Sequence, residues 1–162
     1  MPDLLTHYLT AKIITGKSAT KAISPFFLGT ILPDVLSRIP SIVIINLFEK
    51  YDCHLGRFLA IFHSPLVLIL ICLLIAYFFE ENLRKGVFKL LILGTALHLV
   101  LDMLQKTFTS HSGYLWFFPF SFKSFNIPLF WPDQSLYFIP ILLIVLIFIW
   151  WFKPDEEMIR KR

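Results

Sequence analysis

Charged side chains are scarce in this 162-residue chain: Asp, Glu, Lys and Arg make up 16% of it, whereas hydrophobic residues make up 57%. Soluble globular domains contain about 25% charged residues and about 45–50% apolar ones. A chain of this length with a mean hydropathy of +0.73 has too little polar surface to cover a solvated core. The composition excludes a soluble enzyme, a disordered chain and a small secreted scaffold. It indicates a membrane protein with a single domain, residues 1–162.

Cysteine is also scarce. With only Cys53 and Cys72 in the chain, neither a disulfide framework nor a CxxC metal clip is expected. The formal net charge is only +4, and the basic residues are scattered rather than gathered in a stripe. This distribution argues against nucleic acid as a partner and leaves membrane lipid as the expected one.

Three apolar stretches are long enough to form transmembrane helices, which need about 20 residues each. They cover Phe58–Phe79, Val87–Leu104 and Ser135–Phe152. Because the turn Glu80–Gly86 is short, the first two helices are expected to form an antiparallel hairpin. The sequence therefore predicts an all-α, multipass helical membrane protein.

The N-terminal part is less regular. Pro25–Phe48 is apolar, but four residues that a lipid-facing helix does not tolerate interrupt its middle: Pro33, Asp34, Arg38 and Pro40. This pattern predicts two half-helices or a re-entrant element rather than a continuous helix.

Two further segments are predicted outside these helices. Leu4–Thr15 is expected to be an amphipathic helix whose apolar face carries His7 together with Leu4, Tyr8, Ala11 and Ile14. Thr109–Asp133 lacks helix periodicity and is dense in Phe, Trp, Pro and Ser. It is expected to form an ordered loop in the membrane interface.

Ionisable side chains within apolar helices are costly, so they suggest a functional site. His98 and Asp102 are four residues apart and share one helix face, and Gly94 leaves room one turn earlier. An imidazole and a carboxylate at this spacing can bind one metal ion. A His–Asp pair that only holds neighbouring helices together would have the same spacing, so this pattern alone leaves both interpretations open.

The predicted hairpin brings a third residue to the same level. His63 lies 20 residues before Leu83, the centre of the turn, and Asp102 lies 19 residues after it. At about 1.5 Å per helical residue, the two reach nearly the same depth in the membrane. The shared depth favours a common site, although a lone buried histidine bonded to a backbone carbonyl is the alternative for His63.

Five short motifs occur in order along this hydropathy profile. They are Thr6-His7, Leu32-Pro33-Asp34, His63-Ser64, His98-x3-Asp102, and Gly113 followed by Trp116–Pro119. In these motifs the chain resembles a family of membrane-bound, metal-dependent hydrolases that includes LexA-regulated inner-membrane hydrolases. That family is remotely similar to the zinc-dependent phospholipase C and single-strand nuclease superfamily, whose all-helical members hold adjacent zinc ions.

The resemblance implies metal ligands at His7, Asp34, His63, His98 and Asp102. Of these, His63, His98 and Asp102 would hold one divalent ion, and His7 would help to hold a second, with Asp102 bridging. Asp34 would be a ligand or the base beside the attacking water, so Asp34 and Asp102 are the expected catalytic carboxylates. One or two ions are expected.

Three other side chains are weaker candidates. His54 follows Asp52 and Cys53 and is expected on a surface turn, and His111 is expected on a loop near the mouth of the site. Arg38 lies one helical turn after Asp34 and could bind a substrate phosphate with its planar guanidinium. Alternatively, Arg38 could extend from a helix end to the interface.

These observations predict a metal-dependent hydrolase of the inner membrane that cleaves a phosphoester of a lipid or lipid-linked substrate. Zinc suits the histidine and carboxylate ligands, with manganese and iron as alternatives. The Lys and Arg residues are nearly balanced between the two faces, with a cytoplasmic tail and an extracytoplasmic site preferred. A small ion or metal transporter and a non-enzymatic membrane scaffold are the alternative functions.

Overall fold

Helices make up the framework of the protein, seen here in a computed structural model. The structure describes residues 4–16, 23–48, 58–106, 114–127 and 129–152. In chain order the elements are α1 (Leu4–Thr15), α2 (Ser24–Phe48), the 3₁₀ turn η2 (Ile61–His63), α4 (Pro65–Tyr77), α5 (Glu81–Met103), the 3₁₀ turn η3 (Pro132–Gln134) and α6 (Ser135–Phe152). The described residues contain no β-strand, which confirms the predicted all-α fold.

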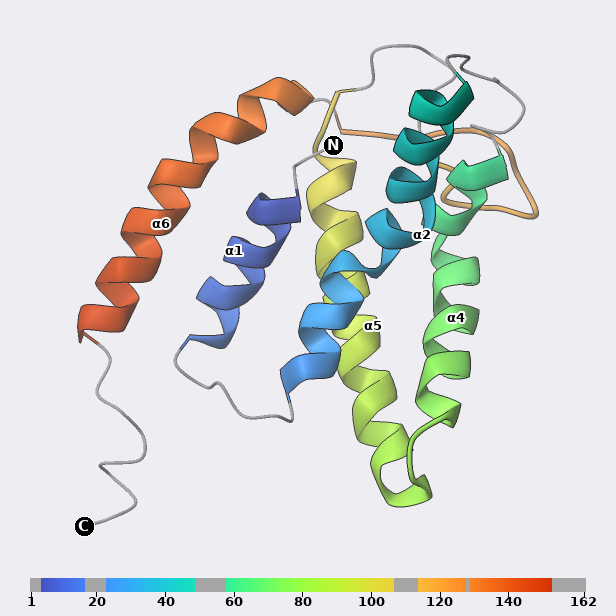
Figure 1. The fold of residues 1–162 in the computed structure, drawn as a ribbon, viewed down its shortest axis with the longest axis horizontal. Coiled ribbons are helices and arrows are strands. Elements are labelled where there is room, and N and C mark those ends of the chain that lie inside the picture. The colour runs from blue at the N-terminus through green and yellow to red at the C-terminus, as the bar shows by residue number, and fades with distance from the viewer. Residues whose placement is uncertain (1–3, 17–22, 49–57, 107–113, 128, 153–162) are drawn as a thin grey trace.

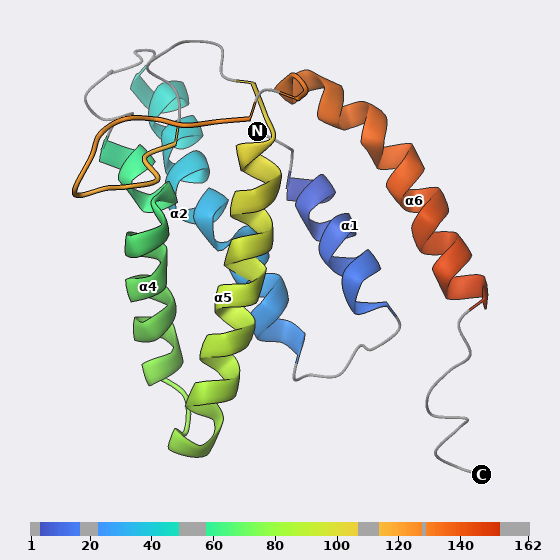
Figure 2. The same cartoon turned by 180° about the vertical axis from the view of Figure 1, so that it is seen from behind.

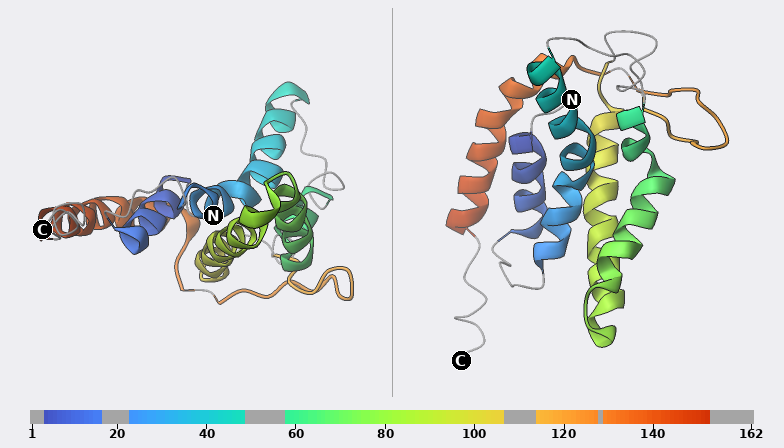
Figure 3. Two further views of the ribbon diagram at one scale, coloured as in Figure 1. Left: turned by 90° about the horizontal axis from the view of Figure 1, so that it is seen from below. Right: turned by 45° about the vertical axis from the view of Figure 1, so that its right-hand side comes forward.

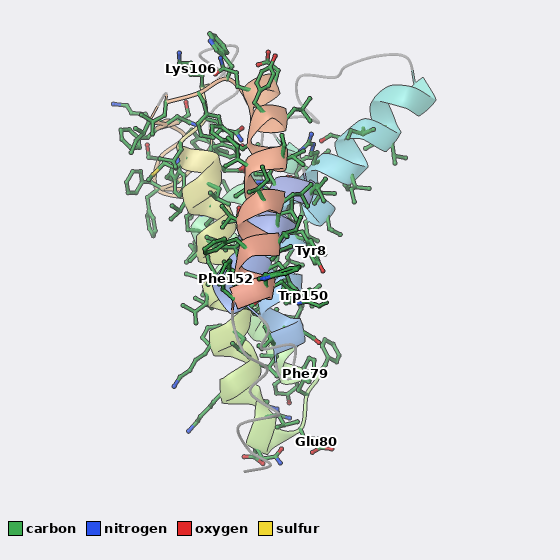
Figure 4. The ribbon with its side chains drawn as sticks, turned by 90° about the vertical axis from the view of Figure 1, so that its left-hand side faces the viewer. Tyr8, Phe79, Glu80, Lys106, Trp150 and Phe152 are labelled. Atoms are coloured by element: carbon green, nitrogen blue, oxygen red, sulfur yellow. The ribbon has the colours of Figure 1, made fainter. Side chains whose placement is uncertain are left out.

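The helices lie side by side with their axes roughly parallel (Figure 1). Helix α5 packs against α2 and α4, and α1 packs against α2 and α6. Seen from behind, α1 separates the outermost helix α6 from the rest (Figure 2). The labelled Lys106 and Glu80 lie at opposite ends of the molecule (Figure 4). The α4–α5 hairpin thus runs along most of its length.

Within the described residues, two helices are long and apolar enough to cross a membrane, Ser24–Ile44 and Glu81–Met103. Glu81–Met103 contains the predicted transmembrane helix Val87–Leu104, so that prediction is confirmed, whereas the predicted number of three is wrong. Phe58–Phe79 and Ser135–Phe152 are not among the long helices, and Ser24–Ile44 was predicted to be interrupted. Helix α6 has the predicted bounds, but its apolar part, Leu136–Phe152, falls among the shorter apolar helices. At about 1.5 Å per residue that part is slightly shorter than the roughly 30 Å hydrocarbon core.

The predicted helix over Phe58–Phe79 is interrupted at Ser64. The Ser64 backbone is extended, with φ −79° and ψ 139°, and its side chain accepts a hydrogen bond from the Val67 N–H at 3.4 Å as the N-cap of α4. Pro65 follows at the first helical position, where its missing N–H leaves no hydrogen bond unmade. As a result α4 has only 13 residues, and His63 lies in η2, outside a regular helix.

Helix α2 is continuous rather than split into half-helices or re-entrant. It contains Pro33 and Pro40 within its 25 residues, and it bends so that its second half leaves the bundle (Figure 3). A proline removes one backbone hydrogen bond and bends a helix without ending it when packing stabilises the rest. Asp34 is tolerated because its side chain is fully buried against protein, not lipid.

Helix α1 has the predicted bounds but a different buried face. Its buried residues are Thr6, His7, Leu9 and Ala11, whereas Leu4, Tyr8 and Ile14 of the predicted apolar face are exposed. His7 is fully buried, as predicted. The face turned to the protein thus carries His7 with Thr6, Leu9 and Ala11, whereas three of the apolar residues predicted on that face are exposed.

Helices α2 and α5 touch at their backbones. A Cβ atom added at Gly29 would collide with the carbonyl oxygen of Leu91, and one added at Gly94 would collide with the carbonyl oxygen of Phe26. Only glycine permits this distance. Next to the contact, the Thr95 hydroxyl donates to the Gly29 carbonyl at 3.2 Å. This close contact fixes α5 against α2 one turn before His98.

Candidate metal centre

Five ionisable side chains from four elements meet inside the bundle. His7 comes from α1, Asp34 from α2, His63 from η2, and His98 and Asp102 from α5, and each is at most 2% exposed. These are the five residues that the sequence motifs pointed to. Asp102 lies one turn from Lys106, so the cluster lies toward the Lys106 end of the molecule (Figure 4).

The Asp102 carboxylate lies at the centre of the cluster. Its Oδ1 is 3.3 Å from Nε2 of His7, and its Oδ2 is 3.4 Å from Nε2 of His63 and 3.3 Å from Nε2 of His98. Asp34 Oδ1 is 3.7 Å from Nε2 of His63. The structure therefore brings His63 and Asp102 together, as the equal depth of the two residues in the hairpin predicts.

Two of the imidazoles are oriented by hydrogen bonds on the side away from the cluster. His98 Nδ1 lies 2.7 Å from the Thr30 carbonyl oxygen, which can only accept, so Nδ1 carries the hydrogen. The Ser37 hydroxyl donates its one hydrogen to the Pro33 carbonyl at 3.0 Å, so at 2.6 Å it accepts from Nδ1 of His63. A neutral imidazole protonated at Nδ1 has a lone pair at Nε2. Both rings therefore present Nε2 lone pairs to the cluster.

These two lone pairs lie close together. Nε2 of His63 and Nε2 of His98 are 3.3 Å apart. Two acceptors at this distance repel each other unless a positive charge lies between or beside them. Either a metal cation or an additional proton, shared with Asp102, would relieve the repulsion.

Several buried atoms of the cluster make no well-aligned hydrogen bond within the described part of the chain, although some of them lie 3.3–3.7 Å from one another. They are both ring nitrogens of His7 and all four carboxylate oxygens of Asp34 and Asp102. Leaving one such group unpaired costs about 1–3 kcal/mol, and more for a charged group. Histidine nitrogens and carboxylate oxygens are the ligands that zinc binds in proteins. The residues present therefore fit a divalent cation.

The ligand atoms form two overlapping groups, each with its atoms within 4.8 Å of one another. One group is His63, His98 and Asp102, and the other is His7, Asp34 and His98. The first is the set that the resemblance implies for one ion. The two groups share His98, whereas the resemblance implies that Asp102 bridges the two ions. His7 also lies beside Asp102, and its ring stacks on that of His98 with the ring centres 3.9 Å apart.

The chain matches the family described as YdjM inner membrane protein over residues 4–160. It belongs to that family. No curated protein and no solved structure shows a significant match. The family's description, together with the two long apolar helices, supports a location in the membrane. Hydrolase activity and similarity to phospholipase C stay predictions for this YdjM family member.

The other predicted candidates have different outcomes. Arg38 is 32% exposed and lies 3.7 Å from Asp34, so a positive charge stands at the edge of the cluster. His54 and His111 fall outside the described residues, and so does Gly113. The predicted interfacial loop is described over residues 114–127 and 129–133, which contain no α-helix and only the start of η3, and residues 114–127 lie at the same end as the cluster (Figures 1 and 3).

The sequence motifs missed three residues around the cluster. Thr30 and Ser37 lie four residues before and three after Asp34, so the same spacing rule that paired His98 with Asp102 could have found both. Tyr114 lies in a stretch without helix periodicity and had no such signal. Its ring lies 5.3 Å from that of His63, and burial together with the negative charge of Asp102 raises the pKa of its hydroxyl well above 10.0.

Proposed function

We propose that this chain is a membrane-embedded, metal-dependent hydrolase that cleaves a phosphoester of a lipid or lipid-linked substrate. The observation that carries the proposal is the meeting of three buried imidazoles and two buried carboxylates, among which the atoms of His7, Asp34 and Asp102 lack well-aligned hydrogen bonds. A helix-pairing scaffold needs one His–Asp pair. Five such groups in one place are instead typical of a hydrolytic metal centre.

In this proposal His63, His98 and Asp102 hold one ion, and His7 and Asp34 complete the centre beside it. Zinc is the preferred metal, with manganese and iron as alternatives. One or two bound ions would supply Lewis acidity, activating a water molecule and neutralising the oxygens of the phosphoester.

The protein's own side chains have supporting roles. The Thr30 carbonyl and the Ser37 hydroxyl hold the rings of His98 and His63 so that each Nε2 faces the centre. Asp34 is proposed to accept a proton from the attacking water. Arg38, held beside Asp34, is proposed to bind a non-bridging phosphate oxygen, since its guanidinium suits phosphate.

A lipid substrate is favoured by the loop at this end of the molecule. Its exposed residues include Phe117, Phe120, Phe122 and Phe125, which are 57–89% exposed. Aromatic side chains concentrate at the boundary between headgroups and acyl chains. A site beside such a loop lies near the depth of a phospholipid phosphate. The extracytoplasmic orientation stays a prediction.

Metal analysis tests the centre directly. Elemental analysis of the detergent-purified wild type is expected to show one or two equivalents of a divalent transition metal, and both His98→Ala and Asp102→Asn are expected to lose most of it. Asp133→Asn is the matched control, because it removes an exposed carboxylate distant in sequence from the cluster. A metal-free wild type, or equal metal content in all variants, would refute the metal centre.

Two further measurements separate the proposed function from its alternatives. Removing the metal with a chelator is expected to lower the melting temperature, because the ion binds only the folded state. If a proton rather than a metal joins His63, His98 and Asp102, the melting temperature will not depend on metal. Release of a phosphorylated headgroup from phospholipid in mixed micelles tests hydrolysis, and metal flux into proteoliposomes without hydrolysis would indicate a transporter.

A further inference from the structure

Gln105 is a buried amide that neither the fold nor the proposed metal centre uses. It is 2% exposed, and its Oε1 and Nε2 have no hydrogen-bond partner among the described residues. Burying an unpaired amide costs about 1–3 kcal/mol. An apolar side chain of similar size would avoid this cost, so the fold alone gives no reason for glutamine here.

The position of Gln105 relates it to the metal centre. It follows Asp102 by three residues and lies just past Met103, the last residue of α5. Its N–H donates to the Asp102 carbonyl at 3.1 Å, so the turn that ends α5 joins the two residues directly. The backbone of Gln105 therefore lies one turn from Asp102, where the end of α5 meets the loop that carries Asn126.

The loop fixes the backbone of Gln105. Its carbonyl accepts a hydrogen bond from Nδ2 of Asn126 at 3.2 Å, and it pairs with Phe130 in an isolated bridge. The next residue, Lys106, donates from its N–H to the Phe130 carbonyl at 2.8 Å. Because the backbone is held from two sides, a loosely placed chain does not explain the unpaired amide.

We propose that Gln105 binds the substrate, donating from its Nε2 hydrogens to an oxygen of the phosphoryl group. The inference rests on the proposed function and extends it by assigning a residue to the substrate. An amide NH₂ offers two donors that never lose their protons, which suits an anionic oxygen beside the carboxylates of Asp34 and Asp102. A phosphoryl oxygen in turn supplies the partner that the buried amide lacks.

The test measures ligand binding by zinc-loaded, purified protein as a rise in melting temperature. Two probes are titrated: inorganic phosphate, and a short-chain phosphatidic acid in mixed micelles. The variants are Gln105→Met and Gln105→Leu, which both replace the amide with apolar groups of similar size. Asn126→Ala is the matched control, because it weakens the support of the Gln105 backbone and keeps the amide.

Both Gln105 variants are expected to keep the metal and to melt, without ligand, at the wild-type temperature or above it. For the same rise in melting temperature, they are expected to need at least about tenfold more of whichever probe stabilises the wild type. This follows because hydrogen bonds to charged groups contribute about 1.5–3 kcal/mol. Asn126→Ala is expected to respond as the wild type does. A response to phosphatidic acid alone would identify the lipid headgroup as the source of the phosphoryl group, and a response to both probes would also support the assignment.

Three results of the ligand titrations would overturn the inference. They are an unchanged dose dependence in both Gln105 variants, no response of the zinc-loaded wild type to either probe, and an equal loss of response in Asn126→Ala. A lower melting temperature of both apolar variants without ligand would overturn it too, because it would show that the amide has a structural partner. The metal content of the wild type, measured separately, shows whether the proposed function itself has failed.

Discussion

The backbone contact between α2 and α5 makes Gly94 the most sensitive position outside the ligands. In Gly94→Ala the new methyl group would collide with the carbonyl oxygen of Phe26 and lie 2.8 Å from the Thr30 nitrogen. Ordinary van der Waals contact begins near about 3.5 Å, so the contact with Thr30 alone requires the helices to separate by about 0.7 Å, and the closer contact with Phe26 requires more. Backbone atoms, unlike a flexible side chain, cannot rotate away.

The energetic cost of this separation has three parts. Overpacking costs about 1–3 kcal/mol. Stretching the hydrogen bonds from His98 to Thr30 and from Thr95 to Gly29 costs about 1 kcal/mol each. Alanine's higher helix propensity returns about 1 kcal/mol. The expected net loss in the free energy of unfolding is about 2–4 kcal/mol.

The same shift should weaken the metal centre. Metal–ligand distances tolerate deviations of only about 0.2 Å, and Thr30, which orients the His98 ring, would move with α2. Zinc affinity is therefore expected to fall by at least about tenfold, since outer-shell changes typically cost 10–100-fold. Chelator competition measures the affinity, and unfolding in a dodecyl sulfate titration, followed by tryptophan fluorescence, measures the stability.

Gly86→Ala is the matched control within the same helix. An added Cβ at Gly86 meets nothing within 4 Å, so this variant is expected to keep its metal affinity and to gain up to about 1 kcal/mol. If Gly94→Ala and Gly86→Ala have the same free energy of unfolding and the same zinc affinity, the close contact between α2 and α5 does not position the site.

Two other substitutions test the surroundings of His63. Ser37→Ala removes the acceptor of the His63 Nδ1 hydrogen, so zinc affinity is expected to fall about 10–100-fold in chelator competition. The circular dichroism spectrum is expected to change little. An unchanged zinc affinity would contradict the assigned orientation of the His63 ring. Ser64→Ala removes the N-cap of α4 and is expected to cost about 1 kcal/mol in dodecyl sulfate unfolding, whereas Ser64→Asn, which can still cap the helix, should lose much less.

Local periodicity explains what the sequence predicted well. The bounds of α1 and α6 follow from continuous apolar stretches with clear ends, and both were predicted correctly. The meeting of His98 and Asp102 follows from helical spacing within one segment. His63 joined them through a count of residues across a short turn, which tolerates small errors in helix ends.

The errors arose where tertiary contacts override local composition. Phe58–Phe79 is apolar throughout, so hydropathy alone predicted one helix, although Ser64-Pro65 is a start signal for a helix at Pro65. In α2 the opposite error occurred: an interruption was predicted where the helix is continuous. The prediction assumed that the two prolines and Asp34 face lipid. Pro33 and Asp34 are tolerated because they are buried in the bundle, and a single sequence does not show which helix will cover them.

Helices α2 and α5 each combine an apolar surface with one polar stripe. Thr30, Asp34 and Ser37 form the stripe on α2, and His98 and Asp102 lie on the facing stripe of α5. Neither stripe can face lipid, because unpaired polar groups there cost several kcal/mol each. The two stripes therefore have to face each other or other polar side chains, and the residues that pair the helices are also those that would bind the metal. For this reason a change that moves α2 from α5 is expected to reduce metal affinity before the fold is lost, because ligand geometry tolerates far less displacement than helix packing does.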